Sequence, residues 1–189
     1  GGNSGNRGKC KQPCRKKYAI DRKWFEESAY RLSLSDLSVG NAIEDLKEAG
    51  VYSFKIEGRM RRPEYVAAAV KYYKNLLVGL NDNGGLSDLK RTYNRGNYTK
   101  GLAFGQDKSF ISSAVQGHIG EFVGTVKVLN GKYICQGSGK FNSGDCFKIL
   151  RDGEEICGAV YGGQEKSGFI LSSKIRLKNG DKVFITTDA

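Results

Sequence analysis

Two cysteines near the start of the chain have a spacing that can bind a metal. Cys10 and Cys14 lie four residues apart in the stretch "SGNRGKCKQPCR", which carries several cations and no acid. Two thiolates at this spacing can bind one metal ion or part of an iron–sulfur cluster, although such sites usually need four ligands. Neighbouring cations favour thiolate chemistry of either kind, metal binding or redox exchange. Three interpretations therefore stay open: cluster ligands, a redox pair and inert thiols.

A second group of polar residues lies in "FKIEGRMRR", residues 54–62. Side chains alternate between the two faces of a strand, so Lys55 and Glu57 would share the face opposite to the apolar residues. If helices cover the apolar face, the polar face points into the mouth of an α/β barrel, where Arg59 follows on a loop and active sites lie. The alternative is an exposed strand with an ordinary Lys–Glu surface pair.

The charge of the chain favours a polyanionic partner. The formal net charge is +11 and the isoelectric point is about 9.4. Nucleic acid is the usual partner of such a protein, although a basic protein need not bind one. The cations that we expect to contact RNA phosphates flank the two motifs: Arg7, Arg15, Lys16, Arg61 and Arg62.

The remaining cysteines and the single histidine give weaker signals. Cys135, Cys146 and Cys157 recur every eleven residues. They could form a three-cysteine metal site, but free cysteine in β-structure is more typically a small buried hydrophobe. We interpret His118 as structural or RNA-facing rather than catalytic. The chain has no phosphate-binding loop and no common hydrolase motif.

The elements that would position the first motifs alternate between strand and helix. After a basic loop at residues 1–24, the pattern predicts strands at 30–34 and 51–58 and helices at 41–49 and 63–78. In the second helix Val66, Val70, Tyr73 and Leu77 recur at helical spacing. This order implies parallel strands with crossover helices. Two such units cannot close a barrel, and the chain has no initiator Met. We therefore expect residues 1–80 to be the last part of a larger α/β domain that is truncated here.

The second half of the chain has an all-β pattern. Residues 81–115 are polar and turn-rich and are expected to form a linker or extended arm. From 116 to 189, apolar β-rich runs at 119–128, 132–136, 145–150, 154–161, 168–172 and 182–187 predict a small closed β-barrel. Tight-turn signals occur at Asn130-Gly131, Asp152-Gly153 and Asn179-Gly180. The expected fold class is thus α/β followed by all-β.

The cellular setting is expected to be a reducing cytoplasm without membrane contact. The sequence contains no apolar run long enough to cross a membrane and no apolar signal sequence at its start. Five cysteines is an odd number and argues against a disulfide framework.

Three motifs in order resemble the collagenase-like peptidase family U32. They are "SGNRGKCKQPCRKKY", "LSLSDLS" and "AGVYSFKIEGRMRRPEYVAAAVKYY", which together span about residues 4–78. The later segments "RTYNRGNYTKG" and "QGHIGEFVG" resemble members that hydroxylate a ribosomal RNA cytidine. The resemblance implies a (β/α)-barrel followed by a small β-barrel and, in many members, an oxygen-sensitive iron–sulfur cluster. It also implies hydroxylation of RNA or of a ubiquinone precursor, with prephenate as co-substrate in some members and collagen degradation in others.

The resemblance also assigns roles to residues. Cys10 matches the cluster cysteine of the Asn-Arg-Gly-x-Cys motif, and Cys14 matches the second cysteine of its longer form. Ser38 stands where several relatives have cysteine, and two further family cysteines would precede the first residue, so the ligand set is incomplete. Lys55, Glu57 and Arg59 match the motif that borders the pocket.

The sequence leaves three functional hypotheses open. The first is the C-terminal portion of an iron–sulfur RNA hydroxylase, in which Glu57 is a base or hydrogen-bond acceptor and Arg59 clamps an acidic co-substrate or a phosphate. The second is a collagenase-like protease, for which we find no nucleophile, and the third is a non-enzymatic RNA-binding module. Exposed apolar faces of the first half could also support self-association.

Overall fold

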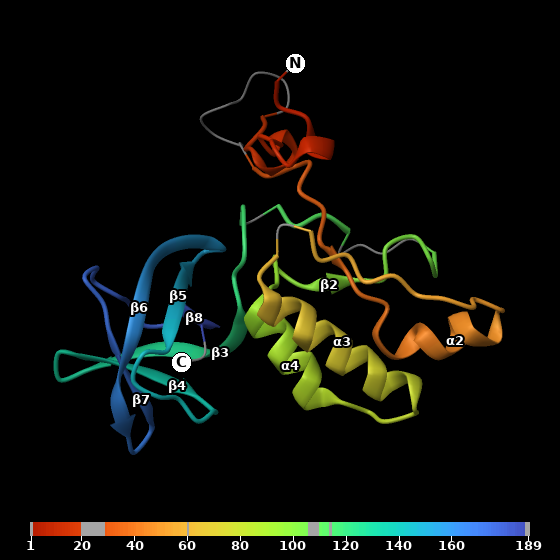
Figure 1. Cartoon of the computed structure of the whole chain (residues 1–189). Coiled ribbons are helices and arrows are strands. Elements are labelled where there is room, and N and C mark those ends of the chain that lie inside the picture. Colours follow the sequence, from red (N-terminus) through yellow and green to blue (C-terminus); the bar gives the residue numbers. More distant parts are fainter. Residues whose placement is uncertain (1, 20–28, 60, 106–109, 114, 188–189) are drawn as a thin grey trace. The chain divides into compact units, whose positions relative to one another are not determined.

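The computed structural model describes residues 2–19, 29–59, 61–105, 110–113 and 115–187 (Figure 1). The chain divides into two compact units. The first comprises residues 1–89 and 97–117, and the second comprises 90–96 and 118–189. Part of the predicted basic loop, residues 20–24, lies outside the described residues.

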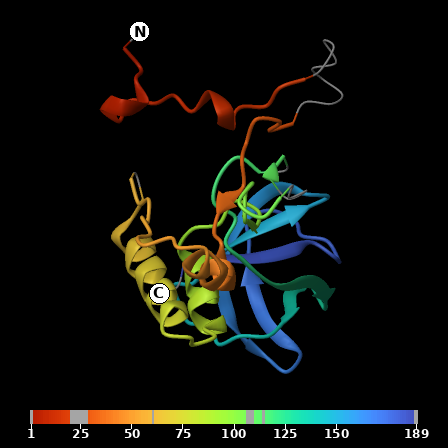
Figure 2. The same ribbon diagram turned by 90° about the vertical axis from the view of Figure 1, so that its right-hand side faces the viewer.

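The described start of the first unit is an extended segment with two short 3₁₀ turns, η1 (Gly5–Arg7) and η2 (Pro13–Arg15). Figure 2 shows this segment as a drawn-out trace with two short helical turns. The predicted strand at 30–34 is reduced to an isolated bridge between Leu34 and Ile111. Cationic and turn-forming residues dominate the segment, so it has little apolar surface to bury.

The two predicted helices of the first unit are confirmed. The first begins as a 3₁₀ turn, η3 (Gly40–Ala42), and continues as α2 (Ile43–Glu48). The second is α3 (Pro63–Leu77), with its proline in the first turn, where a missing N–H costs nothing. A small core joins the helices and contains Ile43, Ala69, Tyr72, Leu76 and Leu89.

The buried face of α3 differs from the face predicted by the valine spacing. Ala69, Tyr72 and Leu76 are buried, whereas Val66 and Val70 are 38% and 39% exposed. The helix carries apolar residues on more than one face, and the aromatic side chain of Tyr72 fills the core better than the smaller valines. The helical spacing of the apolar residues therefore predicted the helix correctly and its buried face incorrectly.

Residues 51–58 do not form the predicted strand. They are irregular, although the alternation survives: Phe54 and Ile56 pack against the helical core while Lys55 and Glu57 are exposed. A strand needs a neighbour that accepts and donates its backbone hydrogen bonds, and no described segment pairs with 51–58. The expected run of parallel strands is likewise absent from the described residues, where the one parallel pair joins β1 (Asp36–Leu37) to β2 (Tyr98–Thr99).

The predicted linker at 81–115 contains a helix, which corrects that interpretation. Helix α4 (Asn83–Thr92) begins after Asp82, whose carboxylate accepts a hydrogen bond of 2.7 Å from the Gly85 backbone N–H. This is the N-cap geometry that satisfies a free helix donor. A β-carbon at Gly85 would collide with the same carboxylate, so a larger residue there would displace the capping side chain of Asp82. The polar composition of residues 81–115 gave no indication of this helix, which buries Leu89.

The second unit contains a closed six-stranded antiparallel barrel, and its six strands were predicted. The strands are β3 (Glu121–Leu129), β4 (Lys132–Gly137), β5 (Cys146–Arg151), β6 (Glu154–Glu165), β7 (Gly168–Ser172) and β8 (Lys182–Thr187). Their order around the barrel is β3-β4-β7-β6-β5-β8, which leaves no open sheet edge. Inward side chains such as Phe147, Phe169 and Val183 fill the interior.

Two of the three predicted tight turns are hairpin turns with left-handed backbone. Asn130 and Gly131 have φ of 49° and 76° between β3 and β4, and Asp152 and Gly153 have 51° and 85° between β5 and β6. Positive φ at both positions is the signature of the type I′ turn. Gly180 also has positive φ, but it lies in the longer connection from β7 to β8.

The architecture supports the α/β followed by all-β class. A (β/α) barrel is not formed by the described residues, so that finer assignment is not established by the fold. In the part of the chain that the structure describes, no helix is long and apolar enough to span a membrane.

Candidate functional site

The segment before Cys10 is a closed turn. Backbone N–H groups of Gly8 and Lys9 donate hydrogen bonds of 3.0 and 3.1 Å to the carbonyls of Gly5 and Ser4. Gly8 has φ of 69°, a conformation that glycine adopts without strain. The sequence Asn-Arg-Gly therefore folds back on itself and presents the cysteine that follows.

Cys10 and Cys14 are both exposed and free. The backbone N–H of Gln12 donates a hydrogen bond of 3.2 Å to Cys10 Sγ. Gln12 itself has left-handed backbone, φ 49°, and η2 begins directly after it. This hydrogen bond and the left-handed turn at Gln12 together orient the Cys10 thiol.

The second motif folds around Glu57. Its Oε1 accepts a hydrogen bond of 2.9 Å from the backbone N–H of Arg59, and its Oε2 lies 3.8 Å from Lys55 Nζ. The Lys55 and Glu57 side chains are 87% and 68% exposed, so their ion pair is a weak surface pair. The carboxylate therefore acts locally as a cap for the turn that positions Arg59.

Arg59 joins the two motifs. Its Nη2 donates a hydrogen bond of 2.9 Å to the backbone carbonyl of Asn6, in the turn that precedes Cys10. The structure thus brings together Arg59, Glu57 and the Cys10 segment. Asn6 was not predicted, because a backbone carbonyl leaves no signal in the residue type.

Arg15 lies inside the first unit rather than on an RNA-accessible surface. It is buried, with an exposed fraction of 8%. Its Nη1 donates to Ser33 Oγ and to the carbonyl of Leu34, the latter at 2.7 Å. We therefore leave Arg15 out of the RNA-contact set, since its guanidinium supports the fold.

The other predicted cations divide by exposure. Arg7, Lys16 and Arg62 are exposed, whereas Arg61 is half-buried and has a partner. Ser38 Oγ shares a hydrogen bond of 2.7 Å with the Tyr73 hydroxyl. The Ser38 hydroxyl therefore contacts helix α3 through Tyr73.

The three barrel cysteines do not form a metal site. Cys135 on β4 is fully buried in the barrel core, and burial raises the pKa of its thiol to about 12. Cys146 and Cys157 lie on the paired strands β5 and β6, while β7 separates β6 from β4. Among the described residues no group of three or more His, Cys, Asp or Glu side chains could hold a metal ion.

His118 has a structural role, in agreement with one of the two interpretations of the sequence. Its Nδ1 accepts a hydrogen bond of 2.9 Å from the backbone N–H of Asn94, and its ring stacks on Tyr93 at 5.6 Å between centroids. Burial lowers the pKa of His118, which favours the neutral imidazole needed as an acceptor. All three residues belong to the second unit.

Comparison with known proteins places the chain in a family. Residues 1–111, more than half of the chain, match the model of Peptidase family U32, and the chain belongs to that family. A collagenase of Porphyromonas gingivalis is 42% identical over 77 residues, which are 39% of this chain and 21% of the relative. No solved structure matches the chain.

Two other relatives have names that refer to RNA. The 23S rRNA 5-hydroxycytidine C2501 synthase of Escherichia coli is 36% identical over 93 residues, 48% of this chain and 14% of the relative. The tRNA hydroxylation protein P1 of Bacillus subtilis is 35% identical over 81 residues, 38% of this chain and 19% of the relative. The matches thus span 14% to 21% of the length of these three relatives.

Proposed function

We propose that this chain is part of an RNA-modifying hydroxylase whose pocket is bordered by the Cys10 segment and the Lys55–Arg59 motif. The observation that carries the proposal is the hydrogen bond from Arg59 to the Asn6 carbonyl. It joins two motifs that lie far apart in sequence into one local site. The names of two relatives, which refer to ribosomal and transfer RNA, supply the substrate class.

Charge supports RNA as the partner. The net charge is +11, and the arm that carries Cys10 and Cys14 has exposed cations at Arg7, Lys9, Lys11 and Lys16. Phosphate contacts of this type bind RNA without reading its sequence. The positive arm would place a polyanion beside the two thiols.

Cys10 and Cys14 fit an iron–sulfur cluster in part. Both thiols are exposed and free, and cysteine thiolates are the usual cluster ligands. Two cysteines are half of the common set of four, and among the described residues no other His, Cys, Asp or Glu side chains complete a metal-binding group with them. A bound cluster supplies one-electron redox chemistry. The chain's own contribution is to hold the Cys10 sulfur near the Gln12 N–H and to anchor the segment through Arg59.

Arg59 and Lys55 would bind an anionic group in the same site. Arg59 uses one N–H group for Asn6, and a guanidinium has five donors in a planar fork. A carboxylate co-substrate of the prephenate type, or an RNA phosphate, suits the remaining donors. Glu57 would act as an acceptor or base through Oε2, the oxygen that faces Lys55 and is not bonded to the Arg59 backbone N–H.

The test has two readouts. Anaerobically prepared protein should contain iron and sulfide and show the broad visible absorption of a cluster, and Cys10→Ser should remove it. In cells that lack the gene, mass spectrometry of the RNA should show that one pyrimidine has lost its added oxygen. Expression of the wild-type protein should restore this oxygen, and expression of Arg59→Ala should not. Iron-free, colourless protein together with unchanged RNA would contradict the proposal.

The second candidate is a collagenase-like protease, favoured by the 42% identity to the Porphyromonas gingivalis collagenase. It requires a nucleophile or hydrolytic metal, and the described residues offer no metal-binding group of three acids, cysteines or histidines. Oxygen-insensitive cleavage of gelatin that Glu57→Ala abolishes would favour this function over hydroxylation.

A further inference from the structure

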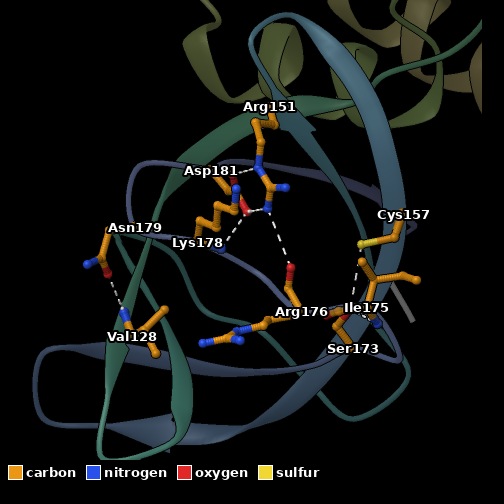
Figure 3. Close-up of polar contacts among 9 residues, drawn as sticks. All are labelled: Val128, Arg151, Cys157, Ser173, Ile175, Arg176, Lys178, Asn179 and Asp181. Carbon is orange, nitrogen blue, oxygen red and sulfur yellow. Dashed lines mark hydrogen bonds and ion pairs between the residues drawn. The ribbon is translucent and has the colours of Figure 1, made fainter.

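The connection between β7 and β8 concentrates exposed cations at one end of the barrel. Residues 173–181 cross this end, where Figure 3 shows Lys178 beside Asp181, Asn179 beside Val128, and Arg176 near Ser173 and Ile175. We call the exposed side chains Lys174, Arg176, Lys178 and Lys182 the cationic cap. None of the four forms an ion pair with any residue that the structure describes. The one acid of this segment, Asp181, is buried and bound by Arg151.

The backbone that carries the cationic cap is fixed from inside the barrel. Leu177 is 2% exposed and belongs to the barrel core. Asp181 accepts two hydrogen bonds of 2.7 Å from Nε and Nη2 of Arg151, and a third of 2.8 Å from the Lys178 backbone N–H. A bidentate arginine pair of this kind fixes geometry as well as contributing energy.

Further hydrogen bonds fix the connection to strand β3. Asn179 Oδ1 accepts a hydrogen bond of 2.7 Å from the Val128 backbone N–H, and Gly180 N–H donates one of 2.9 Å to the Val126 carbonyl. At the other end of the segment, the Ser173 hydroxyl bonds to both backbone groups of Ile175. The backbone is therefore ordered before any ligand arrives, which lowers the entropic cost of binding.

A polar hollow of about 580 Å³ lies beside the cationic cap. It is lined by the β5–β6 turn and by the connection, including Arg151, Lys178 and Lys182. Sites for small molecules are mostly apolar with a few polar groups, whereas most side chains around this hollow are charged or polar, the acids Asp152 and Asp181 among them. Such a lining suits a hydrated anionic backbone.

We propose that the cationic cap binds the phosphate backbone of RNA and so makes the barrel an RNA-anchoring module. This inference rests on the proposed function, which makes RNA the substrate class, and adds the surface that holds the RNA. The contacts are ionic and not directed at bases, so the cap fixes position without reading sequence. The four cations of the cap outnumber the acids at this end of the barrel, which are Asp181, bound by Arg151, and the exposed Asp152 and Glu154 of the β5–β6 turn.

The experiment compares two charge-matched variants of the full chain. Lys174→Ala with Lys178→Ala removes two cap charges, while Lys140→Ala with Lys166→Ala removes two exposed charges from the opposite end of the barrel, after β4 and between β6 and β7. Binding is measured by fluorescence anisotropy with an oligouridine of about 20 nucleotides over a range of salt concentrations. All four side chains are exposed, so both variants should keep the wild-type circular dichroism spectrum.

The cap variant should bind more weakly and with a shallower salt dependence. Each lost contact to a single strand reduces the salt slope by about 0.7, which for two contacts is roughly a 25-fold loss of affinity at about 0.1 M salt. The control should stay within about twofold of wild type. An equal loss of affinity in both variants, or no loss in the cap variant, would contradict RNA binding by the cationic cap. Neither result would contradict the proposed RNA modification.

Two other outcomes separate this inference from the proposed function. Wild-type protein that binds labelled polyglutamate and not oligouridine would identify an acidic protein as partner and overturn both proposals on RNA. Cap-dependent RNA binding by a protein that leaves cellular RNA unmodified would support the cap and overturn the hydroxylase.

Discussion

Arg59 Nη2 and the Asn6 carbonyl, 53 residues apart in sequence, are joined by a hydrogen bond of 2.9 Å. This contact fixes the turn before Cys10 to the turn that Glu57 caps. It is solvent-exposed, so it contributes about 1 kcal/mol at most to local order. The contact fixes the position of the segment that carries Cys10 relative to Arg59.

Arg59→Ala should loosen the Cys10 segment. Loss of about 1 kcal/mol corresponds to roughly fivefold faster hydrogen exchange at the Gly8 and Lys9 amides, because the turn that protects them opens more often. Arg62→Ala removes an equally exposed arginine and serves as control. Unchanged exchange in Arg59→Ala would show that the turn is held by its own backbone bonds alone.

Arg15→Ala should destabilise the first unit by about 2 kcal/mol. The substitution leaves Ser33, which is fully buried, without its charged donor. Exchange of the Ser33 and Ser35 amides should rise by roughly 30-fold. Lys16→Ala, at an exposed neighbouring position, should leave this exchange unchanged. Normal protection in Arg15→Ala would mean that the buried guanidinium is dispensable.

The cysteines should differ sharply in reactivity. Cys10 and Cys14 are exposed and should react with Ellman's reagent in the folded chain. Cys135 is fully buried and its thiol pKa is raised to about 12 by burial, so it should react after unfolding. Mass spectrometry of the labelled peptides checks this order. Early labelling of Cys135 would contradict the closed barrel core.

His118 should make the second unit less stable in mild acid. Burial lowers its pKa in the folded state, so between neutral pH and that lowered value the unfolded chain binds the proton more readily. The stabilisation of the folded state by neutral His118 is complete above the ordinary histidine pKa of about 6.5. It is lost as the pH falls from there through the lower pKa of His118 in the folded state. Urea unfolding at several pH values measures it. His118→Gln should show a flatter dependence over this range.

Asp181→Asn should destabilise the barrel by about 2 kcal/mol, since Arg151 would lose a charged partner. Burial opposes ionisation of Asp181, but hydrogen bonds from Arg151 and Lys178 outweigh it and lower the pKa. The stabilisation is therefore present above the ordinary pKa of about 3.9 and is lost as the pH falls through the lower folded value. Asp152→Asn, at an exposed turn position that accepts asparagine, is the matched control for urea unfolding.

Local signals in the sequence predicted the barrel well. Alternating apolar residues and the pairs Asn130-Gly131 and Asp152-Gly153 specify strands and turns over a few residues, and the strands then pair with near neighbours. The same reasoning failed at 51–58, where alternation was read as a strand although pairing depends on a distant segment. It also missed α4, because a polar helix that buries little more than Leu89 resembles a linker.

The candidate site was predicted in its residues and not in its contacts. The motifs pointed to Cys10, Cys14, Glu57 and Arg59, but no residue type could indicate that Arg59 contacts a backbone carbonyl. Charge alone placed Arg15 among the RNA contacts, whereas burial assigns it to Ser33 and Leu34. The cations of the cap were also overlooked, although four of them occur within nine residues, 174–182.

The sequence by itself determined the helices α2 and α3, the six barrel strands, the net charge and the family motifs, because these depend on composition and on spacing over short distances. Tertiary structure alone decided which cations remain available. Packing buries Arg15 against Ser33 and binds Arg151 to Asp181, while the same packing fixes a backbone that leaves Lys174 and Lys178 exposed. Desolvation and pairing depend on neighbours that are distant in the chain, so they appear once the chain has folded.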